Sequence, residues 1–369
     1  MDFGFTGAQR ELFERMASLG ERAEASDGPD RLRVLAEGGA LGLSIPREHG
    51  GAGLDLVTTA GAYEALGGTL RDGGVLLAAG AHLFGVAMML VKLGTPEQKA
   101  RWLPGLASGE IIATVCATEE GAGSDVAAVQ SLAEPSGDGF TLTGDKRYVT
   151  AAACAGLFFV VARSSLDARG LTALLVPSAS NGVSVGAPLA TMGLRNAGLA
   201  PVSFASTRVE AGSVVGRPGA GLAAFQVAMT YERALILAFR LGAMAAELRR
   251  SVAFVRRRKL GEQPIAKHQA VAHRVARMKL RLETARLLTY RAAWALDRGE
   301  RAQAEAALAK WPVADCATAS AFDALKLRGG TGYLEESGLM QDLDDAVGGG
   351  IHSGTDDVLA GIVAAWMGL

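Results

Sequence analysis

The chain has 369 residues, of which 49% are hydrophobic, which is enough for two or three domains or one large composite unit with a substantial core. Its 37 lysines and arginines nearly balance its 38 aspartates and glutamates, and no basic stripe runs along it. Because nucleic-acid binding needs a row of cations against the phosphates, this composition argues against nucleic acid as a partner.

Cysteine and histidine usage argues against a disulfide framework and a metal site. The three cysteines, Cys116, Cys154 and Cys316, lie far apart without any CxxC spacing, and the five histidines show no metal-ligand spacing. Residues 1–4 also lack the basic and apolar pattern of a signal peptide. We therefore expect reduced thiols, no metal and a cytoplasmic protein.

Residues 1–113 are predicted to form an N-terminal helical domain. Residues 8–23 are amphipathic, a second helix is expected over 30–41 with its end near Gly42, and a glycine-rich turn follows at 46–53. The uncharged run at 73–91 approaches the length of a membrane span. Its four glycines and His82 favour a buried core helix, so no membrane partner is expected.

The pattern changes to strands over 114–222, which we interpret as a β domain. Strands are predicted at 140–143, 146–150, 157–161, 171–176, 183–185 and 202–204. A hairpin is expected at 136–139 and a turn at Gly144 and Asp145.

Residues 223–369 are predicted to be a helical bundle. Long helices are expected over 222–259, 265–297 and 301–327, separated by Gly261, Pro264 and Gly299. Apolar stripes on long helices with short connections are typical of antiparallel bundles.

Several short motifs occur along these three regions, and their order supports a family resemblance. TEEGAGSD at 118–125 resembles a TEPxAGSD signature, and GDKRYVT at 144–150 resembles GxKxWIT with Tyr148 in place of tryptophan. IPREHGGAG at 45–53, GTPEQK at 94–99 and GGTGY at 329–333 complete the set. On these motifs the chain is identified as a member of the acyl-CoA dehydrogenase family. The resemblance implies a mixed α and β fold: an N-terminal helical domain, a middle β-barrel-like domain and a C-terminal four-helix bundle.

The resemblance implies FAD as the cofactor. It assigns hydrogen bonds to the flavin ring to Thr118 and Thr150 and stacking beside the ring to Tyr148. Gly123 has no side chain to block the approach of a pyrophosphate, and Ser124 offers a hydroxyl. The further FAD contacts that the resemblance implies are Arg258, in a segment that touches the neighbouring subunit's FAD, and Gly329, Gly330, Thr355 and Asp357.

The catalytic carboxylate has two candidate places in this family. The C-terminal place, a YEGT-like motif, is IHSGT at 351–355, so the acid position holds Ser353, whose hydroxyl alone is no base at neutral pH. The second place is the LxxER motif of a branch that resembles isovaleryl- and long-chain acyl-CoA dehydrogenases, and MTYER at 229–233 puts Glu232 there. Glu232 shares a helix face with apolar residues, which makes its burial costly unless it has a function. The alternative is a salt bridge to a basic residue of a neighbouring helix.

The leading hypothesis is FAD-dependent α,β-dehydrogenation of an acyl thioester, with Glu232 abstracting the α proton. The thioester is carried by CoA or by an acyl-carrier protein, and the resemblance implies an electron-transferring flavoprotein as acceptor and a homodimer or homotetramer. Implied substrate contacts are Ser124, Thr230, Arg233 and Tyr333. Thr230 replaces an often acidic residue near the pantetheine arm, which indicates an unusual carrier.

Two alternatives remain at this stage. One is a flavin oxidase or monooxygenase on the same scaffold. The other is a non-catalytic binding paralogue, motivated by Ser353, by the altered FAD-contact segment at 258–265 and by Lys326, which stands where the family often has glutamine.

Overall fold

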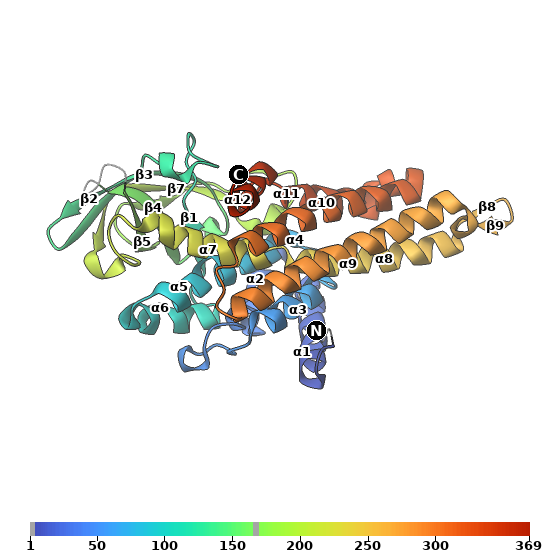
Figure 1. Cartoon of the computed structure of the whole chain (residues 1–369), viewed down its shortest axis with the longest axis horizontal. Coiled ribbons are helices and arrows are strands. Elements are labelled where there is room, and N and C mark those ends of the chain that lie inside the picture. Colours follow the sequence, from blue (N-terminus) through green and yellow to red (C-terminus); the bar gives the residue numbers. More distant parts are fainter. Residues whose placement is uncertain (1–3, 165–169) are drawn as a thin grey trace.

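The computed structural model describes residues 4–164 and 170–369, so the first three residues, on which the signal-peptide expectation partly rests, lie outside it. Figure 1 shows the sheet at one end of the molecule, the N-terminal helices beneath it, and long helices that extend to the other end. This arrangement confirms the predicted mixed fold.

The N-terminal region is helical, as predicted. Helix α1 (Gly7–Glu24) begins with a capping box between Thr6 and Gln9. Helix α2 (Arg31–Glu37) is shorter than predicted, because Gly39 adopts a left-handed conformation (φ +76°) and ends the regular backbone before Gly42. Helices α3 (Leu56–Gly67) and α6 (Pro96–Ser108) complete this layer.

The apolar run that follows α3 is a core helix with a π-helical centre. It comprises α4 (Gly73–Gly80), a π-helical segment (Ala81–Ala87) and α5 (Met88–Leu93). By length and composition this stretch and residues 221–257 would both suffice to cross a membrane. In the first of them 94% of the most apolar window is buried inside the molecule, as predicted for a core helix.

The middle region is a curled seven-stranded sheet. Six strands follow the order β1-β4-β2-β3-β7-β6, and the seventh, β5, pairs with β4 outside this order. The strands are β1 (Ala113–Cys116), β2 (Leu132–Ser136), β3 (Gly139–Val149), β4 (Leu157–Ser164), β5 (Leu171–Pro177), β6 (Val183–Val185) and β7 (Ala200–Glu210). The predicted hairpin at 136–139 joins β2 to β3.

The predicted turn at Gly144 and Asp145 is wrong. β3 runs through both residues, and its pairing with β7 shifts between Leu142 and Gly144 and again between Lys146 and Val149. A bulge bends a strand without ending it, and glycine is suited to such a site. Gly144 is also required by packing, since a Cβ there would lie 2.3 Å from the Ser131 hydroxyl oxygen.

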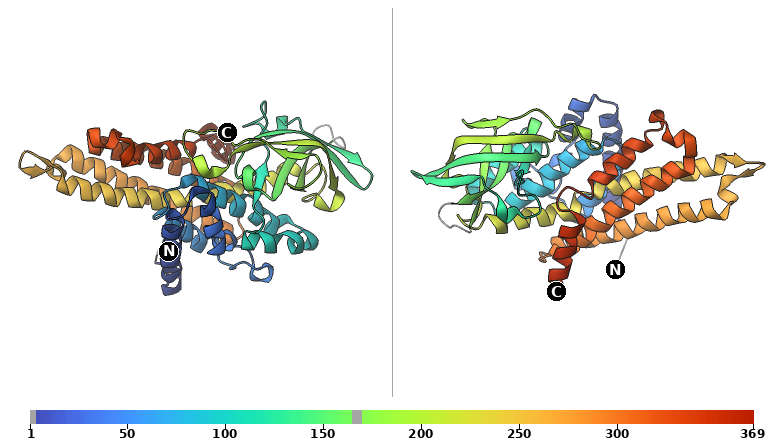
Figure 2. Two further views of the ribbon diagram at one scale, coloured as in Figure 1. Left: turned by 180° about the vertical axis from the view of Figure 1, so that it is seen from behind. Right: turned by 90° about the horizontal axis from the view of Figure 1, so that it is seen from above.

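The C-terminal region is the expected helical bundle. The predicted helix at 222–259 is interrupted at Ile236 and Leu237, giving α7 (Gly221–Leu235) and α8 (Ala238–Arg257). α8, α9 (Gln269–Asp297) and α10 (Gln303–Arg328) lie side by side in all the views (Figure 2). A short hairpin of β8 (Lys259–Leu260) and β9 (Gln263–Pro264) joins α8 to α9. The chain closes with α11 (Leu339–Gly348) and α12 (Asp356–Trp366).

One hydrophobic core joins the three regions. It includes Leu83 and Phe84 of the π-helical segment, Phe159 of β4 and Met229 of α7. α7 therefore packs between the sheet and the N-terminal helices, and Glu232 lies on this shared helix.

Candidate active site

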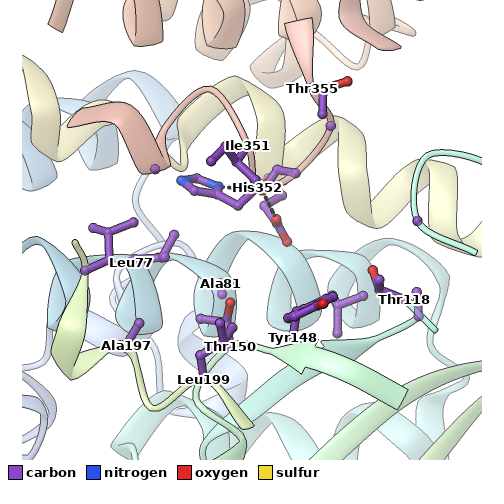
Figure 3. A pocket seen from close by; sticks show the side chains of 18 of the residues that line it. Leu77, Ala81, Thr118, Tyr148, Thr150, Ala197, Leu199, Ile351, His352 and Thr355 are labelled. Carbon is purple, nitrogen blue, oxygen red and sulfur yellow. Dashed lines mark hydrogen bonds between the residues drawn. The ribbon is translucent and has the colours of Figure 1, made fainter. Parts of the chain in front are cut away.

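A cavity of about 620 Å³ lies where the three regions meet. Residues of β1 and its following turn, the end of β3, α7 and the loop before α12 surround it. Figure 3 shows Thr118, Tyr148 and Thr150 on one side of this cavity and Ile351, His352 and Thr355 on the other. The predicted site residues that line it are Thr118, Gly123, Ser124, Tyr148, Thr150, Glu232, Arg233 and Thr355.

The strand side of the cavity is fixed by backbone contacts. The backbone N–H of Arg147 donates to the carbonyl of Thr118 (2.8 Å), and the Thr114 hydroxyl donates to the carbonyl of Thr150 (2.5 Å). Tyr148 has φ +57°, a region that residues with a Cβ rarely occupy outside functional sites, and its ring is 57% exposed. An exposed aromatic ring held this way offers a stacking face to a planar ligand.

A buried ion pair supports this wall from behind. Lys146 is fully buried and donates to Glu119 Oε1 (2.7 Å) and to the carbonyls of Ala117 (3.1 Å) and Val161 (2.6 Å). Glu119 also accepts from the backbone N–H groups of Gln130 and Ser131. Burial alone would raise the pKa of Glu119, but these hydrogen bonds and Lys146 hold it below its usual value. The pair ties the turn after β1 to β3 and β4.

Glu232 lies on α7, which forms the helix wall of the cavity, in a different environment. Its side chain is buried, and burial raises its pKa, opposed by the Ser353 hydrogen bond and by the charges of Arg233 and Lys310. Glu232 makes no ion pair with any residue among 4–164 and 170–369. The alternative prediction, a salt bridge from Glu232 to a basic residue of a neighbouring helix, is therefore wrong among the described residues. Glu232 Oε2 lies against Gly85 of the π-helical segment, where a Cβ would come within 2.4 Å.

Ser353 stands where the motif resemblance predicts the other acid position, and it contacts Glu232. Its hydroxyl donates to Glu232 Oε1, and its Oγ lies 3.0 Å from His352 Nδ1. Two cations hold this loop: Arg233 Nε donates to the carbonyl of Ser353 (2.8 Å) and Lys310 Nζ to that of Gly354 (2.6 Å). Burial lowers the pKa of Lys310 to about 8 and that of His352 to about 3.

Sequence reasoning missed these contacts of Ser353, His352, Lys310 and Gly85. Ser353 and His352 lie in the IHSGT stretch, and the difference between this stretch and YEGT indicated only that the acid is missing there. Lys310 and Gly85 carry no motif signal at all.

Six predicted residues do not line this cavity. The Thr230 hydroxyl donates to the carbonyl of Gln226 (2.7 Å) within α7. Arg258 lies at the far end of α8, and Asp357 is exposed in the first turn of α12. Gly329, Gly330 and Tyr333 form an exposed 3₁₀ turn after α10, where the Tyr333 side chain is 75% exposed. Within one chain, these six residues are therefore not brought together with Glu232.

The residues around the cavity fit the flavin that the motifs imply. At Gly121 and Gly123 an added Cβ would meet nothing within 4 Å, so the space in front of this turn is open to a ligand. Among the described residues the buried hydroxyl of Thr191, which lines the cavity, has no hydrogen-bond partner. A buried polar atom without a partner is costly, and a bound ligand can satisfy it.

Known proteins resemble the chain over its whole length. An L-prolyl-(peptidyl-carrier protein) dehydrogenase of Pseudomonas fluorescens is 38% identical, with 99% of both chains aligned. A 3-(aryl)acrylate reductase of Clostridium sporogenes is 31% identical over 90% of this chain and 89% of its own. Among solved structures, the prolyl acyl carrier protein oxidase AnaB has a TM-score of 0.96 at 32% identity, covering 99% of this chain and 100% of its own. An FAD complex of PigA has a TM-score of 0.95 at 30% identity, with 100% of both chains covered.

Three family domains match in order. The acyl-CoA dehydrogenase N-terminal domain matches residues 7–110, the middle domain residues 114–207 and the C-terminal domain residues 219–368. The chain is therefore an oxidoreductase of the acyl-CoA dehydrogenase family.

Proposed function

We propose that this chain catalyses the FAD-dependent α,β-dehydrogenation of an acyl thioester, with Glu232 as the base. The observation that carries the proposal is the position of Glu232: a buried carboxylate without an ion pair among the described residues, lining the same cavity as Thr118, Tyr148 and Thr150. A carboxylate in a water-poor site has its pKa moved toward the working range of a general base.

The reaction removes two hydrogens from adjacent carbons. Glu232 takes the α hydrogen as a proton, and the β hydrogen leaves as a hydride. Bound FAD supplies the acceptor for that hydride and its electron pair. Thr118 and Thr150 would hold the flavin ring edge, Tyr148 would pack beside the ring, and Gly123 and Ser124 would face its phosphates. Buried apolar residues such as Leu77 and Ala81 line the cavity, which would help to keep water from the base.

We further propose that the acyl group is an aminoacyl group, L-prolyl, carried as a thioester on a carrier protein. The support is that two relatives, from Pseudomonas fluorescens and Serratia, are named L-prolyl-(peptidyl-carrier protein) dehydrogenases, and that PigA has a structure with FAD and proline. Acyl-CoA is the alternative, since relatives such as the short-chain acyl-CoA dehydrogenase of Bos taurus are 32% identical.

The electron acceptor separates a dehydrogenase from an oxidase. AnaB is named an oxidase, and another similar structure, at 26% identity, is that of an electron transferring flavoprotein of Acidaminococcus fermentans. Oxygen consumption during turnover, compared with reduction of an added electron-transferring flavoprotein, tells the two apart. We propose the flavoprotein as acceptor; rapid oxygen consumption would favour the oxidase.

The test is an anaerobic titration of the FAD-loaded protein, followed by its visible spectrum. L-prolyl-carrier protein is expected to bleach the flavin absorbance, whereas Glu232→Gln should bind FAD and stay oxidised. Bleaching by acyl-CoA esters alone would replace the proposed carrier. A protein that takes up no flavin would overturn the proposal and favour a non-catalytic paralogue.

A further inference from the structure

The loop before α12 places two polar side chains in line with Glu232. His352 Nδ1 lies 3.0 Å from Ser353 Oγ, and the Ser353 hydroxyl donates to Glu232 Oε1. These contacts link residues 121 positions apart in the sequence. They place a hydrogen-bonded pair at the family position where the other branch carries its acid.

With Glu232 ionised, the number of available hydrogens sets the direction of this chain of hydrogen bonds. A serine hydroxyl has one hydrogen, and an ionised carboxylate has none. Because the Ser353 hydrogen goes to Glu232, the Ser353 oxygen must accept the hydrogen of His352 Nδ1. His352 is then the neutral tautomer with its hydrogen on Nδ1, in agreement with the absence of any hydrogen-bond partner at its buried Nε2 among the described residues.

The backbone of Ser353 is held in a conformation that costs free energy. Its φ is +58°, in the left-handed region that residues with a Cβ rarely adopt. Such a residue persists where its surroundings fix it, and functional sites are where this is found. Here Arg233 and Lys310 hold the two successive carbonyls of Ser353 and Gly354.

We propose that Ser353 and His352 are positioning residues that hold the Glu232 carboxylate ionised and in one orientation for proton abstraction. This inference rests on the proposed function, in which Glu232 is the base. Ser353 donates to one carboxylate oxygen, while Gly85 leaves room for the other on the opposite side. His352 acts through Ser353 by setting where the hydroxyl hydrogen points.

Charged groups on four helices surround the pair, and one of them, Arg240 of α8, lies near His352. Arg233 of α7 and Lys310 of α10 lie near Glu232, and Asp356 of α12 lies near Lys310. Both cations also favour the ionised form of Glu232, but they are engaged with loop carbonyls. Among the described residues, the Ser353 hydroxyl is therefore the hydrogen-bond donor that reaches the carboxylate directly.

The experiment titrates Glu232 in the FAD-loaded protein without substrate. The carboxyl C=O stretch is followed by infrared difference spectroscopy, with Glu232→Gln identifying the band. In Ser353→Ala the band is expected to persist to higher pH than in the wild type, because the ionised form has lost its donor. The same variant should lose rate mainly at the acid end of the pH–rate profile, by about tenfold for the loss of one hydrogen bond to a charged group.

A matched pair tests His352. Asparagine presents an N–H close to the place of Nδ1, whereas phenylalanine has none, so His352→Asn is expected to titrate near the wild type and His352→Phe to shift toward Ser353→Ala. An unchanged Glu232 titration in both Ser353→Ala and His352→Phe would overturn the inference. A shifted titration in a protein that oxidises no thioester would uphold the positioning contacts and reject Glu232 as base, so the two failures are distinct.

Discussion

Two glutamates near the cavity, one behind its strand wall and one lining it, have nearly the same exposed fraction but different partners. Glu119 is 8% exposed and Glu232 7% exposed. Glu119, behind the strand wall, has an ammonium partner and two backbone N–H donors, and its pKa is lowered. Glu232, on the helix wall, has one hydroxyl donor, and its pKa is raised. Glu232 is also the more deeply enclosed of the two, so depth of burial and the set of partners together separate the two pKa values.

The largest expected effect separates the two glutamates by rate. Glu232→Gln should lower the rate of flavin reduction by about 10²- to 10⁴-fold, the usual contribution of a general base, while FAD binding persists. The matched variant Glu119→Gln should retain most of the rate in whatever fraction folds and binds FAD. Rapid anaerobic mixing measures both rates. Equal losses of rate in the two variants would break the distinction.

The next effect concerns stability on the strand side. Lys146→Met leaves Glu119 buried without its cation, which should reduce the free energy of unfolding by about 3–5 kcal/mol. Chemical denaturation measures this loss. The double variant Glu119→Gln with Lys146→Met should be more stable than Lys146→Met alone, because no buried charge is left unpaired. A double variant less stable than the single one would contradict the role of the ion pair.

Acid stability should depend on the buried His82 of the π-helical segment. His82 Nδ1 accepts from the backbone N–H of Ala113 (3.0 Å), its Nε2 bonds to the carbonyl of Leu106 (3.0 Å), and burial lowers its pKa to about 4. Between pH 6.5 and 4 the unfolded chain takes up the proton and the folded chain does not. The contribution of His82 to the free energy of unfolding is therefore complete above the pKa of about 6.5 that this histidine has in the unfolded chain. It decreases by about 3 kcal/mol as the pH falls to 4.

Denaturation at a series of pH values checks this sign. His352, with its pKa also lowered, to about 3, adds to the slope of the wild type in the same window. The flatter slope expected of His82→Asn isolates the contribution of His82. If the free energy of unfolding depended on pH with the same slope in the variant and the wild type, a contribution of His82 to acid stability would be ruled out.

The smallest effect tests how closely the helix wall fits Glu232. In Gly85→Ala the new Cβ would lie 2.4 Å from Glu232 Oε2, so the carboxylate must move, and we expect a loss of about 10- to 100-fold in kcat with FAD binding intact. Gly80→Ala is the control in the same apolar run, since its Cβ would crowd the flexible Cδ1 of Ile236 at 2.8 Å and lie at ordinary contact distance, 3.6 Å, from the Phe84 ring. Steady-state kinetics measures kcat for both variants. Equal losses of kcat in the two would contradict a close fit between Gly85 and the Glu232 carboxylate.

The sequence predicted the order of the three regions and much of the site because motifs and periodicity are local. Thr118, Tyr148, Thr150 and Glu232 all stand at motif positions, and all line the cavity. The interruption at Ile236 and Leu237 was missed because neither residue is a glycine or proline, and the strand through Gly144 because a bulge and a turn share the same residue types.

The contact between Ser353 and Glu232 could not be predicted for a different reason. It is tertiary, and only the approach of the loop before α12 to α7 creates it. From the motif alone, serine at this position indicated a missing acid. The structure shows a hydrogen-bond donor to the acid on the other helix.

The most direct test of the account is α-proton exchange. The flavin is first reduced chemically so that no hydride can leave, and the enzyme is then incubated with L-prolyl-carrier protein in D₂O. Mass spectrometry of the released prolyl group reports deuterium at the α carbon. We predict that the wild type exchanges this hydrogen and that Glu232→Gln exchanges it no faster than a sample without enzyme. Exchange by Glu232→Gln at the wild-type rate would contradict the assignment of Glu232 as the base.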